Sequence, residues 1–165
     1  MNYLEILIAA FTAFLLGAIW YSALFGKIWQ REAGLSDEDV KGRVGVTFGV
    51  SFLMFLVISF LMEMFWGSHI HNGTIAHGAF HGMQGALFSA VPLMIINYLY
   101  QRKSIILMAI DGLYAIAFFA VIGSMLAALP LYETAPTADE LKESLEWAQE
   151  FIQKKQDELD ALNSN

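Results

Sequence analysis

The chain has 165 residues, of which 57% are hydrophobic and 15% are charged, and its mean hydropathy is +0.53. Soluble domains carry about 45–50% apolar and about 25% charged residues, so the composition indicates a membrane protein. The absence of cysteine excludes a disulfide scaffold, a thiolate metal site and an iron–sulfur cluster. The net charge of −7, with no continuous basic face, argues against a nucleic-acid partner.

Four apolar segments are each long enough to cross a lipid bilayer as a helix, which takes about 20 residues. These segments cover residues 3–25, 44–66, 79–100 and 105–129. Apolar positions surround each helix, as expected where lipid replaces water. The sequence therefore predicts an all-α integral membrane protein. We expect a four-transmembrane-helix bundle over residues 1–132 and a C-terminal extramembrane amphipathic helix in an acidic tail, residues 133–165.

Basic residues gather in two connections that would lie on one side of the membrane. These connections hold six of the nine Lys and Arg residues: Lys27, Arg31, Lys41, Arg43, Arg102 and Lys103. The connection between the second and third spans contains neither Lys nor Arg. Because cytoplasmic loops carry the excess of basic residues, we expect both termini on the non-cytoplasmic side. Tyr98 is then expected in the aromatic belt at the inner membrane surface.

Local signals predict two helix boundaries in the first connection. Ser36 followed by Asp39 is typical of a capping box, so a helix should begin near Asp37 and continue into the second span. Residues 27–32 are consistent with a short interfacial helix that ends at Gly34, or with a plain connector.

Small residues spaced four apart predict close contacts between helices in a membrane. Gly78 and Gly82 form one such pair, and Gly45 and Gly49 form another. Pro92 lies inside the third apolar segment, where the missing N–H predicts a kink.

All four histidines lie near the outer ends of the second and third spans, close to Glu63: His69, His71, His77 and His81. His77 and His81 are four residues apart, so they share one face of a helix, which is the spacing of paired imidazole ligands. Imidazoles with a carboxylate suit a divalent metal such as zinc, copper, nickel or iron. A pH sensor or proton relay, or a polar turn at the membrane surface, is the alternative interpretation.

Asp111 is a carboxylate inside an apolar segment. It follows Ser104 by seven residues, which is about 10 Å of helix. A charge at that depth is costly, so we expect it to face the bundle interior and either be protonated or have a partner. Polar residues expected at a similar depth are Tyr21, Ser22, Ser51, Asn97 and Tyr114. We expect Asn97 to contact Asp111, which makes the group either an ion or proton site or a structural tie.

The tail carries a helical pattern of a different kind. Apolar residues alternate at spacings of three and four, and Lys155 occupies the remaining position: Leu141, Leu145, Ala148, Ile152, Leu159 and Leu162. This pattern is typical of a coiled-coil seam. It predicts self-association or binding of a protein partner, with a solitary helix docked on its own domain as the alternative.

Several stretches resemble a bacterial membrane protein family of unknown function, number 1761. The resemblance rests on Gly17-Ala-Ile-Trp-Tyr-Ser22, Leu24-Phe-Gly-Lys27 with Trp29, Gly34-Leu-Ser-Asp-Glu-Asp39, Asn97-Tyr-Leu-Tyr-Gln-Arg-Lys-Ser104, and the segment from Gly112-Leu-Tyr114 to Gly123-Ser-Met-Leu-Ala127. It implies a small multi-pass protein of the bacterial plasma (inner) membrane. It implies no activity, substrate or functional residue. The histidine-rich turn and the acidic tail depart from the family pattern.

These features predict an assembly or binding protein embedded in the lipid bilayer, which forms a homo-oligomer or recruits a protein through its tail helix. A small transporter or channel that uses Asp111 and the outer histidines is the alternative. A membrane metalloenzyme is a third interpretation, although no nucleophile motif, phosphate loop or pair of carboxylates supports catalysis.

Overall fold

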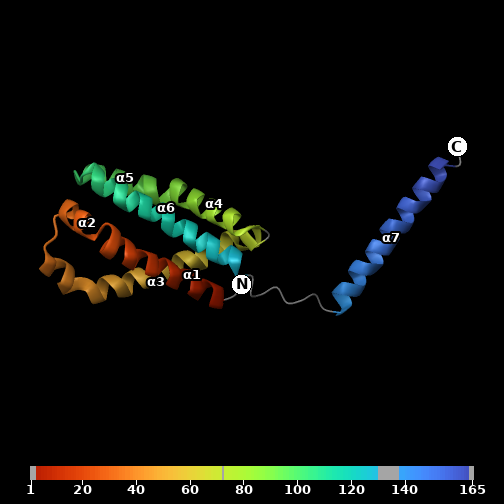
Figure 1. Ribbon diagram of the computed structural model, residues 1–165, viewed down its shortest axis with the longest axis horizontal. Coiled ribbons are helices and arrows are strands. Elements are labelled where there is room, and N and C mark those ends of the chain that lie inside the picture. The colour runs from red at the N-terminus through yellow and green to blue at the C-terminus, as the bar shows by residue number, and fades with distance from the viewer. Residues whose placement is uncertain (1–2, 72, 130–137, 164–165) are drawn as a thin grey trace. The chain divides into compact units, whose positions relative to one another are not determined.

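The computed structural model describes residues 3–71, 73–129 and 138–163, and these residues contain helices but no strands. In chain order the elements are α1 (Tyr3–Ile19), η1 (Trp20–Leu24), α2 (Gly26–Ala33), α3 (Asp37–His71), α4 (Ile75–Gly85), η2 (Ala86–Ala90), α5 (Val91–Tyr100), α6 (Ile105–Ala128) and α7 (Ala138–Asn163) (Figure 1). The elements η1 and η2 are short π-helices. The all-helical prediction is therefore confirmed for the described residues.

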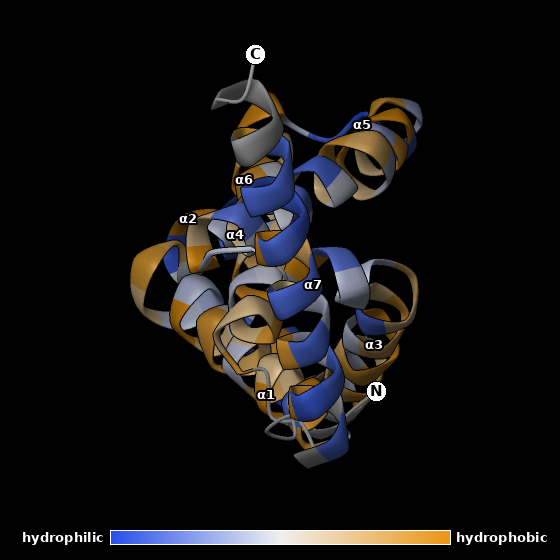
Figure 2. Ribbon diagram, turned by 90° about the vertical axis from the view of Figure 1, so that its right-hand side faces the viewer, coloured by the Kyte–Doolittle hydropathy of each residue, from blue (hydrophilic) through white to orange (hydrophobic). Residues whose placement is uncertain are grey.

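Four helical stretches are long and apolar enough to cross a membrane: Tyr3–Leu24, Asp37–Ile70, Ile75–Tyr100 and Ile105–Ala128. They coincide with the four predicted apolar segments, although the second is longer at both ends. Figure 2 shows apolar residues around these helices, whereas α7 carries a large hydrophilic face. The chain divides into two compact units, Met1–Pro130 and Leu131–Asn165, which we describe separately.

The capping box at the start of α3 is present as predicted. The Ser36 hydroxyl accepts the backbone N–H of Asp39 at 3.1 Å, and the Asp39 carboxylate accepts the backbone N–H of Ser36 at 2.9 Å. The short helix α2 ends at Gly34, whose φ of 74° lies in the left-handed region that favours glycine. The predicted start of a helix near Asp37 is therefore confirmed, and of the two interpretations of residues 27–32 the structure contains the helix that ends at Gly34.

The helix α2 is linked to the start of α6 through a carboxylate. The Ser104 hydroxyl accepts the backbone N–H of Leu107 at 3.1 Å, which caps α6. Ser104 is also hydrogen-bonded to Glu32. This hydrogen bond, followed by that of the adjacent Arg31, lowers the pKa of the Glu32 carboxyl. These contacts hold the end of α2 near the first turn of α6.

Glycine allows α4 and α6 to pack backbone against backbone. A Cβ atom at Gly78 would overlap the carbonyl oxygen of Gly123, and one at Gly82 would overlap that of Phe119. The predicted packing role of the first glycine pair is confirmed. At Gly45 and Gly49, by contrast, no described atom lies within 4 Å of a built Cβ, so this second pair makes no such contact among the described residues.

The core of the first unit lies where α1, α3 and α6 meet. Ala9 and Ala13 of α1 are fully buried there, and small residues let the helices approach closely. The larger core side chains come from α3 and α6: Met62, Ile70, Phe118, Ile122 and Leu126.

The third apolar stretch is irregular before Pro92. The backbone N–H of Val91 bonds to the carbonyl of Ala86, five residues earlier, which is the π-helical pattern. Pro92 has no N–H for the carbonyl of Phe88. Where the sequence predicted a kink, the structure has the π-helix η2 directly before Val91 and Pro92.

A three-histidine cluster and a buried carboxylate

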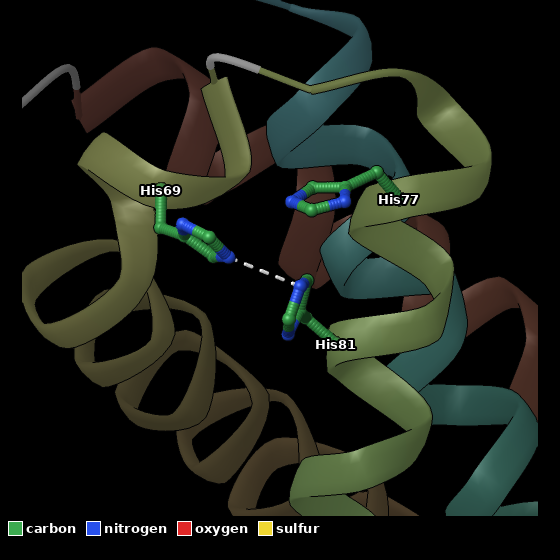
Figure 3. A group of neighbouring side chains, drawn as sticks. All are labelled: His69, His77 and His81. Atoms are coloured by element: carbon green, nitrogen blue, oxygen red, sulfur yellow. Dashed lines mark hydrogen bonds between the residues drawn. The ribbon is translucent and has the colours of Figure 1, made fainter.

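The start of α4 positions two of the histidines. The Thr74 hydroxyl accepts the backbone N–H of His77 at 3.2 Å and caps the helix. His77 and His81 each immediately precede a glycine that packs against α6. One residue turns an α-helix by about 100°, so the imidazoles project from a neighbouring face. Figure 3 shows both rings directed toward His69, which lies near the end of α3.

The three imidazoles are close enough to share one ion. The Nε2 atoms of His69 and His81 are 3.1 Å apart, and each of the three residues offers a ring nitrogen within 4.8 Å of the others. Two nitrogens bound to one tetrahedral zinc ion at about 2.0–2.1 Å lie about 3.3 Å apart. The hydrogen-bonded Nε2 atoms of His69 and His81 are therefore separated by nearly the distance of a shared ligand pair, and His77 offers a nitrogen within 4.8 Å of both residues.

The cluster lies at the surface and has a polar neighbour. His69 is exposed, whereas His77 and His81 are partly buried. The side chain of Gln84 is hydrogen-bonded to His81, one helical turn away. Metal-binding histidines commonly use such an outer partner to fix the ring orientation.

Three of the five predicted metal ligands are thus brought together. Glu63 is 7% exposed, and its carboxylate lies beside Gly67 in α3 and is not a member of the group. The side chain of His71 lies outside the part of the chain that the structure describes.

The second polar centre surrounds Asp111, which is 8% exposed. The Tyr21 hydroxyl donates to Oδ1 at 2.8 Å, and the Tyr98 hydroxyl donates to Oδ2 at 2.7 Å. The three residues belong to η1, α5 and α6. Both carboxylate oxygens therefore accept a hydrogen bond from a different element.

Aromatic rings hold Tyr21 in place. Its ring lies 4.8 Å from that of Tyr114 and 5.3 Å from that of Trp29, in both cases edge to face. The hydroxyl of Tyr114 fills the space beside Gly17, where a Cβ would lie 2.7 Å from it. The π-helical turn η1 sets the position from which Tyr21 reaches Asp111.

The remaining predicted members of this site lie elsewhere. Asn97 is exposed, and Ser22 is exposed and donates to the carbonyl of Ala18, one turn earlier in its own helix. Ser51 of α3 is partly buried, and among the described residues neither it nor Asn97 is bonded to Asp111. Tyr98, expected only in an aromatic belt, makes the contact that we expected of Asn97.

The apolar seam of α7 is open to solvent in its own unit. Leu141, Leu145, Ile152 and Leu159 are between 50% and 62% exposed. Ala148 is partly buried, and the side chain of Leu162 lies outside the described residues. Lys155, the polar member of the seam, pairs with Glu158 at 2.8 Å. Off the seam, the exposed rings of Trp147 and Phe151 stack 5.4 Å apart.

Residues 3–71 and 73–129 therefore form a helical bundle with four helices long and apolar enough to span a membrane. The family model described as "Protein of unknown function (DUF1761)" matches residues 4–127, and the chain belongs to this family. The resemblance expected from the sequence is thus confirmed. No curated protein and no solved structure matches the chain.

Proposed function

We propose that this protein is a multi-pass integral membrane protein that binds a transition-metal ion through His69, His77 and His81. The observation that carries this proposal is the convergence of three imidazole nitrogens, from two helices, within 4.8 Å of one another. Imidazole nitrogen suits zinc, copper or nickel, whereas calcium and magnesium prefer oxygen ligands. The ion that we propose is therefore zinc, copper or nickel.

The four apolar helices support insertion in a lipid bilayer, and the basic residues support one orientation. The connections 25–36 and 101–104 carry Lys27, Arg31, Arg102 and Lys103, which favour the cytoplasmic side of a plasma membrane. In that orientation both termini and the histidine cluster lie on the non-cytoplasmic side. The metal would then bind from the non-cytoplasmic side of the membrane.

Asp111 supports a structural role within the bundle. Its two oxygens accept hydrogen bonds from Tyr21 and Tyr98, on two other elements. Because both oxygens already accept hydrogen bonds, the arrangement favours a carboxylate that joins the helices over one that binds an ion. The residues on which the family resemblance rests include Gly17, Tyr21 and Tyr98, which lie in or beside this centre.

The tail supports a second proposed function, which is self-association. The apolar seam of α7 is exposed, and few acidic residues flank it. Three acidic residues recur every seven positions on the opposite face of the helix: Glu143, Glu150 and Asp157. Two copies could therefore bury their seams without bringing those carboxylates together. A second copy of this chain is the partner that the repeat favours.

The metal proposal is tested by titrating the full-length protein, purified in detergent without a polyhistidine tag, with Zn²⁺ in a calorimeter. We expect one ion per chain. The loss of an outer-shell partner lowers metal affinity about 10–100-fold, so His77→Ala and His81→Ala should each lower it by more than about 100-fold. Asp111→Asn is the matched control and should bind as the unchanged protein does. Equal affinity in the histidine variants would contradict the proposal.

A further inference from the structure

The histidine cluster offers few ligand atoms for a transition metal. Among the described residues the group has three members, each with one ring nitrogen, and no carboxylate joins them. Structural zinc sites are closed by four protein ligands. Sites with three protein ligands keep the fourth position for water or a substrate. Among the described side chains, which do not include that of His71, the donor count matches the second kind of site.

The position of the cluster gives solvent a route to the ion. His69 is exposed and lies two residues from the end of α3, and His77 is in the first turn of α4. Figure 3 shows the three rings between these two helix ends. An ion held there lies at the edge of the bundle, whereas the packed core is formed by other residues of α1, α3 and α6.

The charge of the ligands determines what the fourth position attracts. Three neutral imidazoles contribute no negative charge, so a divalent ion bound to them keeps its charge of +2. Such an ion lowers the pKa of a bound water molecule toward neutrality. Near neutral pH the fourth ligand is therefore partly hydroxide, and a small anion competes for the same position.

We infer that the metal ion at His69, His77 and His81 keeps an exchangeable fourth position, which holds water or hydroxide and accepts a small monovalent anion. This inference rests on the proposed metal site. The site would then belong to the class of metal sites that exchange a water molecule or a small anion, and not to the structural sites that protein ligands close completely.

The test uses Co²⁺ as a spectroscopic probe in the full-length protein in detergent. Four-coordinate Co²⁺ absorbs visible light far more strongly than the hydrated ion. We expect this absorption on loading, a saturable change of the bands when azide is added, and a reversible change between pH 6 and pH 9. Asp111→Asn should give the same three responses, and His81→Ala should give only the weak spectrum of hydrated Co²⁺.

The outcomes separate the inference from the proposal on which it rests. Strong Co²⁺ absorption that responds to neither azide nor pH would mean that a fourth protein ligand closes the site, and would overturn the inference alone. A spectrum of hydrated Co²⁺ in the unchanged protein would overturn the metal site itself.

Discussion

At the scale of single residues, two polar neighbours in the sequence differ in whether they hydrogen-bond to Asp111. Tyr98 donates to Asp111, whereas Asn97, its neighbour in α5, is exposed. Adjacent residues on a helix point about 100° apart, so just one of the two can face α6. The phenol also suits the site, since its hydroxyl donates while its ring packs among apolar neighbours.

We predict that Tyr98→Phe destabilises the bundle. The change removes one donor from a buried carboxylate, and hydrogen bonds to charged groups contribute about 1.5–3 kcal/mol. Thermal unfolding in detergent, followed by circular dichroism, should show a transition several degrees lower. Tyr100→Phe is the matched control, because Tyr100 is 87% exposed. Equal transition temperatures for the two variants would mean that Tyr98 does not support Asp111.

At the scale of elements, the same turn of α4 performs two tasks. Gly78 and Gly82 bring α4 against the backbone of α6, and the residues before them, His77 and His81, project toward the end of α3. The approach of two helices thus sets the place of two candidate metal ligands. Metal binding and helix packing should therefore respond to the same substitution.

We predict opposite effects for two Gly→Ala substitutions. At Gly82 the added Cβ meets the Phe119 carbonyl, and forcing an atom into a packed contact costs about 1–3 kcal/mol. At Gly49 nothing described lies within 4 Å, and alanine is favoured over glycine in a helix by about 1 kcal/mol. The temperature of thermal unfolding should be lower for Gly82→Ala than for the unchanged protein, and it should be equal or higher for Gly49→Ala.

The Zn²⁺ titration adds a second measurement to this pair. Gly82→Ala should also weaken Zn²⁺ binding, because it displaces the neighbouring His81. Gly49→Ala should leave the affinity unchanged. If both variants unfold alike and bind Zn²⁺ alike, the glycine contact does not position the cluster.

At the scale of the whole molecule, most of the net negative charge lies in the tail, residues 133–165. Residues 1–132 hold six basic and seven acidic residues, a net charge of −1, whereas residues 133–165 hold three basic and nine acidic residues, a net charge of −6. The acidity therefore characterises the tail and says little about the bundle. A tail that is both acidic and amphipathic is suited to pairing in water through its apolar seam.

We predict that the seam of α7 controls the oligomeric state. Replacing Leu145 and Ile152 together by Gln should reduce the mass of the detergent-solubilised protein to that of a monomer, measured by light scattering with the detergent mass subtracted. The paired control, Glu143→Gln with Glu150→Gln, changes the opposite face and should leave the mass unchanged. A monomeric unmodified protein, or an unchanged mass in the seam variant, would contradict self-association.

Local features of the sequence were sufficient to predict many parts of the fold. The apolar segments, the Ser36 capping box and the stop at Gly34 depend on neighbours within a few residues, and the structure contains each of them. The pairing of His77 with His81 also follows from helix geometry alone. Predicting these features does not require knowing how the helices face one another.

The sequence by itself thus determined the helical class, the four apolar helices, the Ser36 capping box and the family. Tertiary structure decided that His69 joins the α4 pair, that Tyr98 reaches Asp111, and that Gly78 and Gly82 pack against α6 while Gly45 does not. The physical reason is that these helices are apolar on every side. An amphipathic helix indicates in its sequence which face is buried, whereas an evenly apolar helix does not specify its rotation. That rotation comes from the fit of small residues and buried polar groups between helices.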